Sequence, residues 1–147
     1  MWDDDAAVEP LIRAADRKRK TWLKKATDPK ELHLFAQSWR WDGGSELLPL
    51  VANPNCDAGT LLLLFWLGCG EDSYFQYDAI KDIDCEDDRE THRMLRRIET
   101  RLVKKDYKTA NIYFDPTPFI SMADRRDEFA REVPDLFYNP IGRKPRK

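Results

Sequence analysis

The chain has 147 residues, a length that suits a single domain and lets it bury about two-thirds of the surface exposed in its unfolded form. With 41% hydrophobic and 12% aromatic residues, it has enough core-forming side chains to exclude wholesale disorder. The formal net charge of −2 lacks the positive excess typical of nucleic-acid-binding proteins. The best apolar run, Leu61 to Leu67, is too short to span a membrane.

The first residues and the cysteines both indicate a cytoplasmic protein. A secretory signal begins with positive charge and continues with an apolar stretch, whereas residues Met1 to Asp5 are acidic. The three cysteines are an odd number, and their spacing fits neither a disulfide framework nor a zinc site. We therefore expect reduced thiols, with Cys56 and Cys69 packed as small hydrophobic residues.

Two helices are predicted in the N-terminal third. Apolar residues at helical spacing predict a first helix over 4–26, and Pro10 favours a start near Glu9. The sequence Asp28-Pro29-Lys30-Glu31 supplies an N-cap residue, proline at the first helical position and a glutamate three residues after the cap. A second helix should run from there to about Trp39, before a turn at 42–44.

The next two helices are predicted to form a hairpin. A short helix fits Ser45 to Ala52, and Asn53-Pro54 should end it because a residue before proline avoids the α conformation. Asp57 should cap a helix over 58–69, which is apolar nearly all round. A helix of that composition belongs at the centre of a domain.

The C-terminal half carries weaker signals. A helix is predicted over 86–105, with Met94, Leu95, Ile98 and Leu102 facing inward and Thr91 as a further candidate for that face. Residues 111–114 alternate like a strand, a sixth helix is predicted over 121–131, and 133–141 should attach the C-terminus to the body. The fold class is therefore mostly α: one single-domain bundle over 1–141 of about five or six short helices, at most a minor β element near 111–114, and a disordered basic tail over 142–147.

No catalytic motif is visible. The two histidines, His33 and His92, stand beside no nucleophile signature, and no phosphate-binding glycine loop is present. The acidic run that begins at Asp82 resembles a calcium loop but lacks its glycine and its final carboxylate. We therefore predict no enzyme, no catalytic residue, no metal and no cofactor. A small divalent-metal hydrolase or nuclease using Asp82, Asp84, Glu86 and His92 is the enzyme alternative.

Charge is segregated along the chain. Residues 71–90 contain nine acidic and two basic residues, a net charge of −7, whereas the first and fifth predicted helices are rich in lysine and arginine. The acidic segment could dock a basic partner through its neighbouring aromatic residues. The basic helices could instead contact nucleic acid or an acidic partner. The two kinds of segment could also simply screen each other on the surface.

One stretch resembles a known family. Leu32-His33-Leu34-Phe35-Ala36, Trp41-Asp42-Gly43-Gly44 and the run from Asn53-Pro54-Asn55-Cys56-Asp57-Ala58-Gly59-Thr60 to Leu67 resemble the bacterial domain of unknown function 4274, over about 31–70. Tyr107 and Phe114-Asp115-Pro116 also fit. The motif has structural roles: Asn53-Pro54 stops one helix, Asp57 caps the next, and Gly59 allows a close approach.

The resemblance implies a fold more than an activity. Families of this kind are often found near bacterial toxin genes, which favours a cytoplasmic immunity protein that binds and neutralises a cognate toxin or secreted effector by occlusion. The expected partner-binding residues are Tyr74, Tyr77, Asp82, Asp84, Glu86, Asp87 and Asp88. No membrane and no nucleic-acid partner is expected, and the oligomeric state stays open. An adaptor for proteins or nucleic acid is the other alternative.

Overall fold

The fold is mostly helical, as predicted. The computed structural model describes residues 16–38, 47–67, 81, 83, 86–120 and 133–143. Its helices are α2 (Asp16–Lys25), α3 (Pro29–Ser38), α4 (Leu48–Ala52), α5 (Ala58–Leu67), α7 (Glu86–Val103) and α8 (Thr117–Ile120), followed by a short 3₁₀ helix, η4 (Asp135–Tyr138). Among these residues β pairing is limited to one antiparallel bridge, between Phe114 and Ile141. The bridge lies at the end of the segment 111–114.

Helix α3 begins as its sequence predicts. The Asp28 carboxylate accepts a hydrogen bond from the backbone N–H of Lys30 at 2.9 Å, and Pro29 is the first helical residue. This is an N-cap interaction, which satisfies a backbone donor that the helix itself leaves unpaired. Residues Leu32 to Ala36 are all buried. The predicted turn at 42–44 lies outside the described residues.

The two helices predicted on either side of Asn53-Pro54 are also present, as α4 and α5. Asn53 ends α4 in an extended conformation, with φ −68° and ψ 123°, as expected for a residue before proline. The Asp57 carboxylate then accepts a hydrogen bond from the N–H of Gly59 at 2.8 Å and so caps α5. Every residue of α5 from Ala58 to Trp66 is buried, which confirms that this apolar helix is the centre of the fold.

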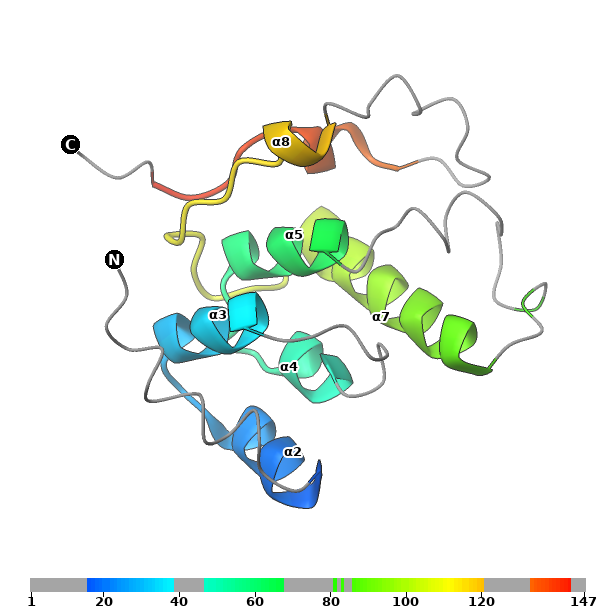
Figure 1. The fold of residues 1–147 in the computed structure, drawn as a ribbon. Helices are drawn as coiled ribbons and strands as arrows, with labels where there is room; N and C mark the ends of the chain where they lie inside the picture. Colours follow the sequence, from blue (N-terminus) through cyan, green and yellow to red (C-terminus); the bar gives the residue numbers. More distant parts are fainter. Residues whose placement is uncertain are drawn as a thin grey trace.

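The other elements pack around α5. Helix α5 contacts α3 and α7, while α4 contacts α2 and α7. Figure 1 shows α5 between the α3–α4 pair and the C-terminal segment, which passes over its other side. The ring centroids of Phe65 and Phe137 are 4.7 Å apart, and Trp66 Nε1 donates a hydrogen bond to the carbonyl of Phe137 at 2.9 Å. These contacts confirm the predicted attachment of 133–141.

Helix α7 presents its predicted apolar face to the core. Met94, Leu95, Ile98 and Leu102 are all buried, whereas Thr91 is partly exposed. Helix α8 is not among the predicted helices. The Asp115 carboxylate accepts a hydrogen bond from the N–H of Thr117 at 2.9 Å, and a short helix starts there. The sixth helix predicted over 121–131 lies outside the described residues.

Asp57 joins α5 to a distant, irregular segment of the chain. The carboxylate is fully buried, and besides capping α5 it accepts three hydrogen bonds from residues 109–112. The donors are the Thr109 hydroxyl at 2.5 Å, the Asn111 N–H at 2.8 Å and the Ile112 N–H at 3.1 Å. Because both oxygens accept two hydrogen bonds, the buried charge is well compensated.

Two glycines let the same segment approach closely. A Cβ atom on Gly59 or on Gly142 would overlap the carbonyl oxygen of Ile112. Gly142 also has φ +92°, a conformation that favours glycine. The prediction that Gly59 permits a close approach is therefore confirmed. Residue Arg143 donates its N–H to the Asn111 carbonyl at 3.2 Å, so 142–143, within the predicted basic tail, lie against this segment.

No described helix is both long enough and apolar enough to cross a bilayer. The sequence prediction of a cytoplasmic location goes beyond this finding and stays a prediction.

We expect Asp57→Asn to destabilise the fold by about 3 kcal/mol, because the amide nitrogen cannot accept the hydrogen bonds that one carboxylate oxygen receives. The matched control is Asp28→Asn, which should change the free energy of unfolding by less than about 0.5 kcal/mol because asparagine is an equally good N-cap residue. Urea denaturation of both variants measures the difference. Equal stability of the two variants would contradict the role assigned to Asp57.

Candidate functional site

The structure describes only part of the predicted partner-binding surface. Tyr74, Tyr77, Asp82 and Asp84 lie outside the described residues. Asp87 and Asp88 are in the first turn of α7, but the structure describes no side-chain surroundings for them. Glu86 is therefore the one residue of this set whose side chain is placed.

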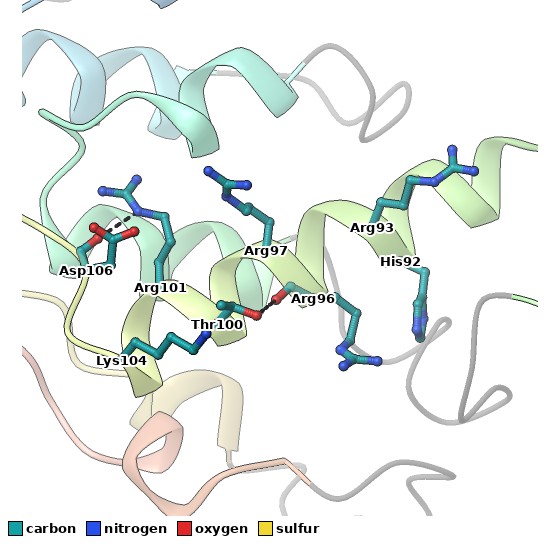
Figure 2. A pocket seen from close by; sticks show the side chains of 8 residues that line it. All are labelled: His92, Arg93, Arg96, Arg97, Thr100, Arg101, Lys104 and Asp106. Carbon is teal, nitrogen blue, oxygen red and sulfur yellow. Dashed lines mark hydrogen bonds between the residues drawn. The ribbon is translucent and has the colours of Figure 1, made fainter.

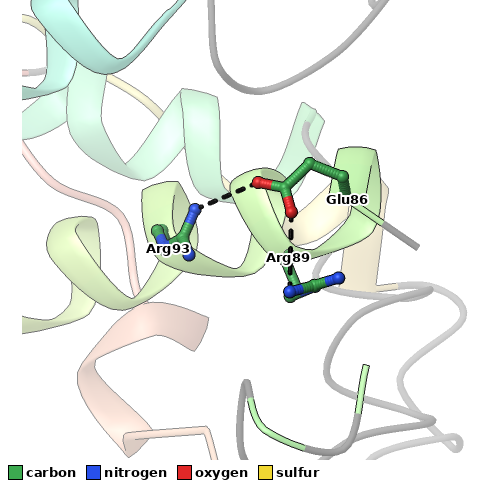
Figure 3. Close-up of polar contacts among 3 residues, drawn as sticks. All are labelled: Glu86, Arg89 and Arg93. Carbon is green, nitrogen blue, oxygen red and sulfur yellow. Dashed lines mark ion pairs between the residues drawn. The ribbon is translucent and has the colours of Figure 1, made fainter. Parts of the chain in front are cut away.

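Glu86 begins α7 and faces the basic side chains of the same helix. Its carboxylate oxygens lie 3.5 Å from Arg89 Nη1 and 3.6 Å from Arg93 Nη1 (Figure 3). The Glu86 side chain is 59% exposed, so these ion pairs are largely solvated. Exposed pairs contribute little to stability, typically about 0–1 kcal/mol. A charged partner could therefore replace them at small cost.

The later turns of α7 form an open basic groove of about 610 Å³. Figure 2 shows that most of its side chains come from successive turns of this one helix. The lining residues, called here the arginine groove, are His92, Arg93, Arg96, Arg97, Thr100, Arg101, Lys104 and Asp106. Five of them carry a positive charge and one carries a negative charge. The groove therefore favours anionic groups.

Arg101 differs from the other arginines of the groove because it is buried and structural. Its Nη1 donates hydrogen bonds to the carbonyl oxygens of Val51 at 2.7 Å and Asn53 at 3.0 Å, and its Nε donates to the Asp106 carbonyl at 2.8 Å. The first two acceptors lie at the C-terminal end of α4, where carbonyl groups have no partner within the helix. Sequence reasoning placed Arg101 among the surface charges, because its acceptors lie 48 and 50 residues away.

The residues of the enzyme alternative are not gathered by the described structure. His92 is 1% exposed, whereas Glu86 is on the exposed side of α7. Asp82 and Asp84 lie outside the described residues. Within the described part of the chain there is no group of three or more His, Cys, Asp or Glu side chains able to hold a metal ion.

Cys56 is buried, as predicted. Burial raises the pKa of its thiol to about 12, although the nearby Arg101 opposes this shift. The thiol therefore stays protonated and poorly nucleophilic at neutral pH.

A second cleft, of about 580 Å³, lies between α3 and the segment held by Asp57. His33 lines it and is 4% exposed; its Nδ1 is hydrogen-bonded to the Thr60 hydroxyl at 2.7 Å. Burial lowers the pKa of His33, and the charge of Asp57 opposes only part of this effect. The basic lining residues Lys30 and Arg143 are matched in number by two carboxylates, so this cleft has no strong preference for either charge.

The described residues form a helical fold that is connected by the buried Asp57 carboxylate and carries an open basic groove. A family model described as "Domain of unknown function (DUF4274)" matches residues 27–103, just over half of the chain. The chain therefore belongs to this family, which confirms the resemblance. The match covers α3 to α7, including Asp57, Gly59 and the arginine groove up to Arg101. No curated protein and no solved structure matches the chain.

We expect Arg101→Lys to lower the free energy of unfolding by about 2–3 kcal/mol, because one ammonium group cannot reach all three carbonyl acceptors. The control is Arg97→Lys, one turn earlier and exposed, which should leave stability nearly unchanged. Thermal and urea unfolding compare the two. A similar, small effect in both variants would show that Arg101 does not cap α4.

We expect His33 to titrate below the ordinary histidine pKa of about 6.5. His33 in the unfolded chain then binds a proton more readily than His33 in the folded chain. Its contribution to the free energy of unfolding is therefore complete above the ordinary pKa and falls as the pH drops toward the folded pKa. Proton NMR of the two histidine rings, assigned with His92→Gln, measures the pKa. A His33 midpoint at or above the ordinary value would contradict the effect of burial.

Proposed function

We propose that this protein is a binding module, and specifically an immunity protein that neutralises a cognate bacterial toxin or secreted effector by covering its active site. The observation that carries the proposal is the charge arrangement along α7. Acidic residues occupy its first turn, which belongs to the net −7 segment 71–90, and cations occupy its later turns. Such an arrangement orients a charged partner as well as attracting it.

The buried polar groups support binding in preference to catalysis. Asp57 and Arg101, the charged residues whose buried contacts are described most fully, use those contacts to connect elements of the fold. The buried His33 has a lowered pKa and contacts Thr60. Charge suited to recognition lies instead on exposed side chains such as Glu86 and Arg93, which are 59% and 52% exposed.

The acidic segment is the proposed contact surface for the toxin. An acidic surface is complementary to the basic active sites of enzymes that act on polyanionic substrates. The weak pairs of Glu86 with Arg89 and Arg93 can be exchanged for pairs with cations of the toxin. Tyr74 and Tyr77 would supply aromatic anchors beside these charges.

The proposal predicts that co-expression of this protein restores growth of cells that produce the cognate toxin, once the toxin has been identified by affinity capture. Asp82→Lys/Asp84→Lys should weaken toxin binding by at least about tenfold and abolish protection, because like charges would face each other. Isothermal calorimetry and growth assays measure the two effects. The control Glu31→Lys/Asp135→Lys, which makes the same change in net charge at exposed residues elsewhere, should bind and protect normally.

Two outcomes would contradict the proposal. Circular dichroism first establishes that the Asp82→Lys/Asp84→Lys variant is folded. If that folded variant then binds and protects like the unmodified chain, the acidic segment is not the contact surface. If no protein captured with this chain is toxic to cells that lack the chain, the proposed immunity function is wrong.

A further inference from the structure

The arginine groove lies outside the acidic contact surface proposed above, and five of its eight lining residues are basic. Its cations are only partly neutralised. Arg93 shares Glu86 with Arg89, and Arg96 Nε is 3.8 Å from the Glu99 carboxylate. Within the described part of the chain, no carboxylate lies within ion-pair distance of Arg97 or Lys104, although both are exposed.

Three of these cations occupy one side of α7 and of the turn that follows it. Arg93, Arg97 and Lys104 are four and seven residues apart, and the Lys104 N–H still donates to the Thr100 carbonyl at 3.0 Å, so their backbone positions fall on one side of the helix. The stripe spans about 16 Å at 1.5 Å per residue. An extended peptide covers that length with about five residues, at about 3.3 Å each. Side chains on alternate peptide residues recur about every 6.6 Å, close to the rise of about 6 Å between Arg93 and Arg97.

The exposed guanidinium groups of the groove point to the same kind of ligand. The Arg96 side chain is 42% exposed, and its Nε lies 3.8 Å from the Glu99 carboxylate, beyond hydrogen-bond distance. Guanidinium groups match the planar geometry of carboxylates and hold them with paired hydrogen bonds.

We propose that the arginine groove binds an extended acidic segment of a partner polypeptide, with carboxylates on alternate residues. A nucleic acid fits less well, because the acidic residues at the start of α7 would lie in line with its phosphate backbone. The footprint of one short stripe would also hold few phosphates, and affinity for nucleic acid rises with the number of phosphates neutralised. This binding site is separate from the acidic contact surface and does not depend on the partner's being a toxin.

The test uses the full-length protein and a fluorescent peptide that alternates glutamate and serine. We expect saturable binding by fluorescence anisotropy at low salt, and weaker binding at higher salt. Arg97→Glu/Lys104→Glu should reduce affinity by at least about tenfold. The same variant should gain affinity for the corresponding lysine–serine peptide, which shows that the effect is electrostatic, and circular dichroism establishes that the variant is folded.

The control reverses two charges on another basic surface. Arg17, Lys18 and Lys25 line an open groove on α2 that also includes the partly buried Trp22. Lys18→Glu/Lys25→Glu makes the same net-charge change, and it should alter affinity for the acidic peptide by less than about threefold. Equal losses in both variants would mean non-specific attraction and would overturn the proposal. Absence of peptide binding, or tighter binding of a short oligothymidylate at Arg97 and Lys104, would overturn it as well.

Discussion

The buried carboxylate of Asp57 is the interaction on which the rest of the described structure depends. It caps the central helix α5 and, through three further hydrogen bonds, holds residues 109–112 against the start of that helix. The Ile112 carbonyl then fits against Gly59 and Gly142, which places the Phe114–Ile141 bridge nearby. The Asp57 side chain therefore holds residues 109–112, a segment with little regular structure. That segment in turn contacts the C-terminal segment around Ile141 and Gly142.

Arg101 provides a second polar connection of the same kind. Its guanidinium group satisfies carbonyl groups at the end of α4, while the neighbouring apolar residues of α7 pack into the core. Helix α7 therefore has two distinct roles. Its inner side and Arg101 contact α4 and α5, and its outer side carries the charges proposed for recognition. Because the outer side is not needed for the core, its charges could change without loss of the fold.

The two proposed contacts use opposite charges on one helix. The acidic start of α7 and the preceding segment would contact a basic surface, whereas the arginine groove would contact an acidic segment. If a single partner carries both surfaces, the contacts would fix its direction along α7, as complementary charges do at specific interfaces. If the partners differ, the protein would connect them. The cleft beside His33 has balanced charges and contributes to neither contact.

The sequence by itself determined the local features: the Asp28 and Asp57 caps, the end of α4 at Asn53, the all-round apolar α5 and the inward face of α7. These follow from interactions between near neighbours or from helical periodicity, both of which are visible in the order of residues. Only the tertiary structure showed that Asp57 holds 109–112 and that Arg101 is buried beneath α4. Both depend on acceptors or donors about 50 residues away, and a surface arginine and a buried one have the same local sequence signal. The proposed partner surfaces combine charge segregation, which sequence reveals, with exposure and pairing, which depend on how α7 packs.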